Sequence, residues 1–297
     1  MPSAFLFHAG ALGDWVLTWP LVRALGRNGW RTALVQAGQK ARLAASVLGA
    51  SGATTEPVEA EQPRFAALWR GPGAIEAGWI RPDVSLVLAF NADGATDAGR
   101  HWLAAAERMF PSARVTAVGP PGSPSRALAW AEFGVHRLGD AAPAPPAGPE
   151  RPIVLHVGAG SPAKRWSLER FGELALSLRG DGATVEPIAG EAELERFSPA
   201  ERALFDQIGG RYLATLDELA RCLAGARAVA AGDSGPAHLA AQLGLPTVAF
   251  FGPTDPSIWA PVGPLARAVA PPDPRPMTWL DVPTALAAVR AAAAARA

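Results

Sequence analysis

Residues 230–256 read AAGDSGPAHLAAQLGLPTVAFFGPTDP, and this is the most informative stretch of the sequence. The small apolar residues 228–231 predict a buried strand, and the letters GDSG that follow predict a sharp turn. Pro236 stands at the first position of the next element, where a helix tolerates proline best, so we expect a helix over 237–243 and another strand over 247–251. A strand, a glycine turn and a helix N-terminus direct free backbone N–H groups at one point, which suits a phosphate. A nucleotide sugar or another phosphate ligand is therefore the first hypothesis.

Length and composition limit the number of domains and the kinds of function that this chain can have. A chain of 297 residues, of which 49% are hydrophobic, is long enough for two domains of ordinary size. Its net charge of +0 gives no electrostatic basis for binding nucleic acid. The single cysteine, Cys222, cannot form an internal disulfide, and its place on the apolar face of an expected helix favours a core position over a reactive thiol.

The sequence favours a cytoplasmic location. No run of about 18 uncharged apolar residues predicts a membrane span. The first apolar segment, over 5–8, is too short for the core of a signal peptide, and Asp14 soon interrupts it. A lone cysteine also fits a reducing compartment.

Short apolar segments alternate with helical patterns along the chain, which predicts parallel sheets with helices on both faces. Besides the two strands above, strands are expected over 3–8, 32–36, 84–90, 114–118, 153–157 and 184–189. Further helices are expected over 14–27, 39–48, 99–110, 167–178, 191–205, 216–224 and 285–297.

The proline-rich stretch over 140–152, DAAPAPPAGPERP, interrupts this alternation and is typical of an extended linker. We therefore expect two doubly wound α/β domains, over residues 1–145 and 146–297, hinged near this stretch. Ligands of such domains bind beyond the carboxyl ends of the strands, which places the expected site in a cleft between them.

Three segments resemble one known family. The C-terminal pattern D-[ST]-G-x-x-H, followed by GPTDP over 252–256, is the first. The others are ALGDWVLTWPLVRALG over 11–26 and the loop GAGSPAKRWSLERF over 158–171. The three segments occur along the chain in the order found in glycosyltransferase family 9, the bacterial heptosyltransferases, which they resemble. The resemblance implies the GT-B fold, in which two Rossmann-like domains face each other across a cleft, the N-terminal one binding the acceptor and the C-terminal one the nucleotide sugar.

The resemblance also implies an activity. It is inverting, metal-independent transfer of a sugar, a heptose, from a nucleoside-diphosphate donor, ADP-heptose, to a lipopolysaccharide-core or related glycan acceptor. No cofactor is implied, and peripheral contact with the inner face of the cytoplasmic membrane is left open. The sequence contains no D-x-D pair, HExxH motif or Cys/His cluster, so a metal-dependent mechanism is not supported.

Asp14 follows the first expected strand and has two interpretations. Aspartate is a favoured N-cap residue, so it can simply begin a helix. The resemblance implies that Asp14 is the catalytic base, because inverting transfer needs a carboxylate to take the proton from the attacking hydroxyl. Gly13 and His8 are candidates for contact with the acceptor or sugar, and the alternative for His8 is a strand-end histidine without a role.

Lys164 and Ser161 lie in a glycine-containing loop between an expected strand and helix. In isolation Lys164 would be an ordinary solvated lysine. The resemblance implies that its ammonium group holds the donor diphosphate and offsets the charge that develops on leaving, with the Ser161 hydroxyl completing the contact. Trp166 is expected to pack in the core.

The opening stretch supplies four further candidates. We expect the N–H groups of Ser234 and Gly235 to bind the phosphates and His238 to bind phosphate or sugar. Asp233 is expected to hold a sugar hydroxyl or to orient the loop. The plainer alternatives are a turn-forming Asp233 and a core His238.

Residues 190–196, GEAELER, follow an expected strand. An acidic residue in such a place commonly accepts hydrogen bonds from ribose hydroxyls. Glu191, Glu193 and Glu195 compete for this role; we choose Glu193, and a solvated helix face accounts for the others.

Two other function classes stay open. A nucleotide-sugar epimerase or hydrolase on the same fold would need a second acid or base in the C-terminal half. A non-catalytic nucleotide-sugar-binding module would have no need of a base at Asp14.

Overall fold

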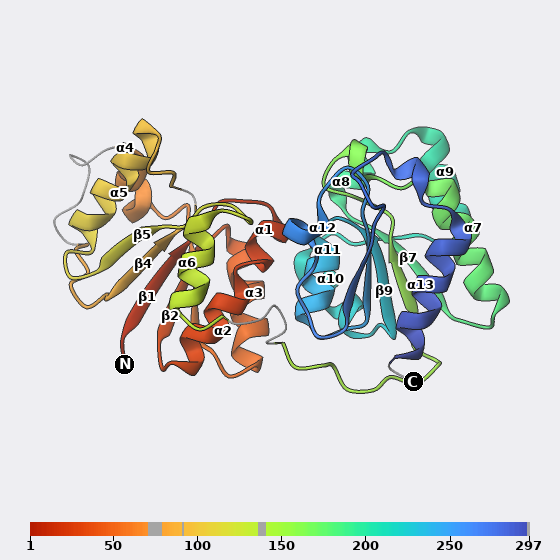
Figure 1. Cartoon of the computed structure of the whole chain (residues 1–297), viewed down its shortest axis with the longest axis horizontal. Coiled ribbons are helices and arrows are strands. Elements are labelled where there is room, and N and C mark those ends of the chain that lie inside the picture. The colour runs from red at the N-terminus through yellow and green to blue at the C-terminus, as the bar shows by residue number, and fades with distance from the viewer. Residues whose placement is uncertain (71–78, 91, 136–140, 296–297) are drawn as a thin grey trace. The chain divides into compact units, whose positions relative to one another are not determined.

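A computed structural model describes residues 1–70, 79–90, 92–135 and 141–295. The chain divides into two compact units, Met1–Arg137 and Leu138–Ala297 (Figure 1). The expected boundary after residue 145 lies inside the second unit, and Asp140, the first residue of the expected linker, lies outside the described residues.

The first unit is a parallel sheet with the strand order β3-β2-β1-β4-β5. Its strands are β1 (Ser3–Phe7), β2 (Arg31–Gln36), β3 (Thr54–Glu59), β4 (Leu86–Ala89) and β5 (Arg114–Ala117). Its helices are α1 (Leu12–Val16), α2 (Trp19–Arg27), α3 (Gly38–Ala50), α4 (Ala66–Arg70), α5 (Asp97–Met109) and α6 (Pro124–Glu132), with a 3₁₀ turn, η1 (Pro63–Phe65).

Both faces of the first sheet are covered, which is why its central strands read as continuous apolar runs. On one face Phe5 and Phe7 pack against Phe110 and Trp102, with ring centroids 5.1 Å apart in the pairs Phe5–Phe110 and Phe7–Trp102. On the other face Leu6 is fully buried.

The second unit is also a parallel sheet, with the order β11-β10-β9-β6-β7-β8. Its strands are β6 (Ile153–His156), β7 (Val185–Ala189), β8 (Arg211–Tyr212), β9 (Ala228–Gly232), β10 (Thr247–Phe250) and β11 (Ala266–Val269). Its helices are α7 (Leu168–Gly180), α8 (Glu191–Arg196), α9 (Pro199–Gln207), α10 (Leu216–Ala224), α11 (Gly235–Gln242), α12 (Pro256–Trp259) and α13 (Val282–Ala294), with 3₁₀ turns η3 (Pro162–Lys164) and η4 (Met277–Trp279). The prediction of two parallel α/β domains is confirmed.

The core of the second unit contains Trp166, which is 1% exposed. Its ring centroid lies 4.9 Å from that of Phe171 and 5.3 Å from that of Phe250, and its indole N–H donates to the carbonyl of Leu280. The predicted packing role of Trp166 is confirmed. Cys222 is buried on α10, also as predicted.

Two helix predictions need correction. The helix expected over 14–27 is two helices, α1 and α2, because the chain turns at Thr18, whose hydroxyl donates to the carbonyl of Trp15 at 2.7 Å. The helix expected over 191–205 is also two, α8 and α9. Ser198 begins the second with a capping box to Glu201, a start signal that also ends the preceding helix.

The strand orders fix where each unit can bind a ligand. In the first sheet the order reverses between β1 and β4, and in the second between β6 and β9. In open α/β sheets, ligands bind outside the carboxyl ends of the strands at this reversal. The segments that follow these four strands are therefore the places to look for a site.

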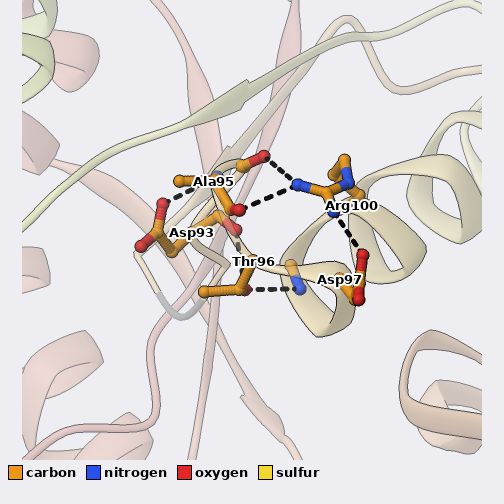
Figure 2. Close-up of polar contacts among 7 residues, drawn as sticks. Asp93, Ala95, Thr96, Asp97 and Arg100 are labelled. Atoms are coloured by element: carbon orange, nitrogen blue, oxygen red, sulfur yellow. Dashed lines mark hydrogen bonds and ion pairs between the residues drawn. The ribbon is translucent and has the colours of Figure 1, made fainter.

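After β4, residues 93–100 are joined by several hydrogen bonds among themselves (Figure 2). The Asp93 carboxylate accepts from the N–H of Ala95, and the Thr96 hydroxyl accepts from the N–H of Gly99 as the cap of α5. The Arg100 guanidinium donates to the carbonyl of Ala95 at 2.8 Å. A Cβ on Gly99 would lie 1.8 Å from the carbonyl oxygen of Asp93, so this loop requires glycine there.

Candidate functional site

The β9–α11 junction has the predicted strand, turn and helix. Ser234 is the N-cap of α11, and its carbonyl accepts from the N–H groups of Ala237 and His238 at 3.1 and 3.3 Å. The N–H groups of Ser234 and Gly235 have no acceptor inside the helix, because the first N–H groups of any helix lack one. A Cβ on Gly232 would lie 3.4 Å from the carbonyl oxygen of Lys164, so the loop after β6 lies directly against this junction.

Asp233 links the two loops. One carboxylate oxygen, Oδ2, lies 2.8 Å from the Lys164 Nζ and accepts from the Thr254 hydroxyl at 2.8 Å. The other, Oδ1, lies 3.9 Å from His238 Nε2. Burial alone would raise the pKa of Asp233, but the bonds from His238, Lys164 and Thr254 outweigh burial and hold the pKa below its usual value. The carboxylate is therefore charged, and it binds residues of both loops. This arrangement is the one expected if Asp233 orients the loop.

Lys164 is not the solvated lysine of the plainer interpretation. Its side chain is 27% exposed, and its ammonium group is paired with the buried Asp233 and lies 5.8 Å from the centre of the Trp259 ring. The ammonium group is thus held at the carboxyl end of β9, beside the N-terminus of α11.

Glu193 is the only buried member of the three competing glutamates; Glu191 and Glu195 are exposed. Its Oε2 accepts from the N–H of Gly190 at 3.0 Å and lies 3.9 Å from His156 Nε2. Burial lowers the pKa of His156, so this histidine is neutral.

His156 was not among the candidates. It ends β6, and its Nδ1 lies 3.5 Å from the Ser234 hydroxyl. The sequence could have indicated His156, because it is a polar residue at the carboxyl end of an apolar strand.

A pocket of about 290 Å³ opens beside the loop after β6. This volume is near the lower end of the range of small-molecule sites, about 300–1,000 Å³. The pocket is lined by Ala159, Ser161, Pro162, Arg165, Glu193 and Arg196. Two sequence candidates, Ser161 and Glu193, therefore share one pocket, together with two cationic side chains.

Gly158 allows Glu193 to occupy this pocket. A Cβ at position 158 would lie 2.1 Å from the Glu193 Oε1. We expect Gly158→Ala to lower the free energy of unfolding by about 1–3 kcal/mol, as overpacking does. Gly180→Ala is the matched control, because a Cβ there meets nothing within 4 Å. Urea unfolding of both variants checks this, and equal stability of the two would contradict it.

In the first unit, the structure excludes the capping interpretation of Asp14. The N-cap of α1 is Ala11, and Asp14 lies within the first turn of the helix. Its Oδ2 is 3.3 Å from the position that a Cβ on Gly10 would take. The half-buried carboxylate therefore stands beside the loop that leaves β1, at the reversal of the first sheet.

Arg126 was also missed by sequence reasoning. It is buried in α6, its guanidinium lies 5.2 and 5.3 Å from the ring centres of Phe90 and Trp130, and its Nε donates to the carbonyl of Gly119. Burial lowers its pKa to about 10, and the negative charge of Asp14 opposes that shift. Arg126 thus supplies positive charge in the surroundings of Asp14.

His8 is 5% exposed and supports the loop. Its Nδ1 accepts from the N–H of Gly10 and from the amide Nε2 of Gln36, each at 3.0 Å. Burial, then the charges of Arg126 and Lys40, lower its pKa to about 3, so the ring is neutral with its proton on Nε2. These contacts give His8 a structural role in the loop, while contact of His8 or Gly13 with an acceptor stays a prediction.

His8 makes the fold sensitive to acid. Its pKa is about 3 in the folded protein against 6.5 for an ordinary histidine, so between these values the unfolded chain binds more protons. The free energy of unfolding therefore falls as the pH falls through this window, by up to about 1.4 kcal/mol per pH unit from this group. His8→Asn keeps an acceptor for Gly10 without titrating, so its stability should depend less steeply on pH. Urea unfolding across the window measures both slopes; equal slopes would contradict this assignment.

Within the described ranges, no three His, Cys, Asp or Glu side chains are grouped so that they could hold a metal ion. The same part of the chain has no helix with the length and apolar character to cross a membrane.

Comparison with known proteins gives the family. The profile of glycosyltransferase family 9 (heptosyltransferase) matches residues 95–277. The Escherichia coli K12 lipopolysaccharide heptosyltransferase 2 is 31% identical over 129 residues, which are 40% of this chain and 36% of that protein. The match therefore spans about a third of the relative's length.

Solved structures share the fold over nearly the whole chain. The E. coli heptosyltransferase WaaC with ADP has a TM-score of 0.67 at 18% identity, covering 98% of this chain and 100% of the other. The same enzyme with ADP-2-deoxy-2-fluoro heptose has a TM-score of 0.63 at 18% identity, covering 98% and 99%. Because the family profile matches more than half of the sequence, this chain belongs to glycosyltransferase family 9.

Proposed function

We propose that this protein is an inverting, metal-independent glycosyltransferase that moves a heptose from ADP-heptose to a lipopolysaccharide-core or related glycan acceptor. The observation that carries the proposal is the ion pair between Lys164 and Asp233, held against the N-terminus of α11 where the second sheet reverses. The names of the relatives support a heptose as the transferred sugar. The ligands named in the two E. coli structures support adenine as the base of the donor.

The donor diphosphate binds the second unit in this proposal. Its oxygens accept from the N–H groups of Ser234 and Gly235, and from the Ser161 hydroxyl. The ammonium of Lys164 has three donors, so it can bind phosphate while keeping its bond to Asp233.

The rest of the donor meets buried polar groups. Glu193, at the wall of the pocket, accepts from the ribose hydroxyls. His238 is 3% exposed, and its Nδ1 has no hydrogen-bond partner among the residues that the structure describes. A buried polar atom without a partner is costly, so a sugar or phosphate group is its proposed partner.

Glycosyl transfer needs one base and one positively charged group that binds the leaving diphosphate. Asp14 takes the proton from the acceptor hydroxyl, whose oxygen attacks the anomeric carbon on the face opposite the diphosphate. The new glycosidic bond forms as the bond between the anomeric carbon and the diphosphate breaks, which inverts the configuration. The electron pair leaves with ADP, and Lys164 offsets its charge. Asp14 belongs to the first unit, Met1–Arg137, so in this proposal that unit binds the acceptor and the second unit, Leu138–Ala297, binds the donor.

This reaction places the protein in the cytoplasm, with peripheral contact at the inner membrane where a glycolipid acceptor resides. The proposal needs no cofactor and no nucleic acid.

A thermal-shift panel tests the donor assignment. Ligand at 100 times its Kd stabilises the folded state by about 2.7 kcal/mol, so ADP and ADP-heptose should raise the Tm, and a chelator should leave the rise unchanged. Absence of a shift with every nucleoside diphosphate would contradict the proposal. Incubation with ADP-heptose alone tests the rival class, because an altered or released sugar without acceptor would indicate an epimerase or hydrolase.

A further inference from the structure

Lys40 has no part in the mechanism above, yet it binds the chain on both sides of Asp14. Its Nζ donates to the carbonyl of Gly10 at 2.9 Å. Its own carbonyl accepts from the indole N–H of Trp15 at 3.1 Å. Lys40 lies in the first turn of α3, so one residue of the neighbouring element holds the loop before Asp14 and the helix that carries it.

A second contact fixes the same loop from the other side. The N–H of Gly10 donates to His8 Nδ1, and the side-chain amide of Gln36 donates to the same nitrogen. Gln36 is itself anchored, because its Oε1 accepts from the N–H of Ala37 at 2.8 Å. Both polar groups of Gly10 are therefore held, and the segment over 36–40 supplies part of each contact.

The fit of this loop is close. A Cβ on Gly10 would lie 2.6 Å from His8 Cε1 and 3.3 Å from both the Cβ and the Oδ2 of Asp14. Helix α1 has only five residues, too few to hold its own conformation without tertiary contacts. A charge-assisted hydrogen bond such as that from Lys40 is stronger than a neutral one.

We propose that Lys40 is a positioning residue that holds Asp14 in the geometry needed for proton abstraction. This inference rests on the proposed function, because it assumes that Asp14 is the base. Misplacing a reacting group by about 1 Å can cost about 10²-fold in rate. A lysine that acts only through Asp14 should change turnover without changing donor affinity, because the donor binds the other unit.

The test compares Lys40→Met with Lys40→Arg. We expect Lys40→Met to lower kcat by about 10- to 100-fold, with the affinity for ADP unchanged. Lys40→Arg keeps a cationic donor and should restore most of kcat. Arg42→Met is the matched control on the same helix, because Arg42 forms an exposed ion pair with Glu59 and should turn over normally. If Lys40→Met does not fold, Lys40→Gln takes its place.

A double-mutant cycle with Asp14→Asn separates positioning from every other role. If Lys40 acts through Asp14, Lys40→Met should slow the Asp14→Asn enzyme no further, measured in single turnovers with excess enzyme. An equal loss in both backgrounds would overturn the inference, as would normal turnover of Lys40→Met. Normal turnover of Asp14→Asn alone is a different result, because it would overturn the proposed function itself.

Discussion

Replacing Asp14 with asparagine should lower the transfer rate by about 10²- to 10⁴-fold, the loss expected for a general base. The affinity for the donor should stay the same, because every residue proposed to bind the diphosphate lies in the second unit. Asparagine has nearly the same size as aspartate, and Asp14 is not the cap of α1, so the fold should persist. Initial rates of transfer and calorimetric titration with ADP check the two halves of this prediction.

Asp97→Asn is the matched control for Asp14→Asn. Asp97 also lies in the first turn of a helix of the first unit, but its side chain is 88% exposed. Its substitution should leave turnover unchanged. Near-normal turnover of Asp14→Asn would remove Asp14 from the mechanism.

Replacing Lys164 with methionine should weaken the binding of ADP by about 10- to 100-fold, since a hydrogen bond to a charged group contributes about 1.5–3 kcal/mol. Binding of adenosine, which lacks the phosphates, should change little. The variant also leaves Asp233 buried without its cation, close to the proposed phosphates. Lys164→Met combined with Asp233→Asn should therefore recover part of the lost affinity for ADP.

Arg290→Met is the control for the loss of one positive charge. Arg290 forms an exposed ion pair with Asp181 in the same unit, at 2.7 Å. Titration with ADP should not distinguish this variant from the unsubstituted protein. Equal affinities of Lys164→Met and the unsubstituted protein for ADP would rule out the phosphate role of Lys164.

Most of the fold could be predicted from periodicity and turn residues. The buried parallel strands are apolar throughout, and glycine or proline marks their ends, so β9, α11 and β10 were located to within two residues. The edge strand β3 was missed, because its sequence TTEPVE has four polar residues and a proline. The breaks before α2 and α9 were missed because the apolar pattern continues across them.

Only those parts of the candidate site that lie in a recognisable sequence motif could be predicted. The spacing of Asp233 and His238, and the loop around Lys164, were visible in the sequence. The pairing of Lys164 with Asp233 was not, because it depends on β6 and β9 being neighbours in the sheet. The same holds for Lys40, which contacts Gly10 and Trp15, and for Arg126, whose charge acts on Asp14; both depend on strand order and packing rather than on sequence spacing.

Mass spectrometry and NMR spectroscopy of an acceptor glycan, after incubation with this protein and ADP-heptose, show directly whether the protein transfers heptose and whether it inverts the anomeric configuration. We expect a lipopolysaccharide-core acceptor to gain one heptose for each ADP released, and Asp14→Asn to slow this gain by about 10²- to 10⁴-fold. The new linkage should have the anomeric configuration opposite to that of the donor. An acceptor that stays unmodified while ADP-heptose binds, or a linkage that retains the donor configuration, would contradict the proposed function.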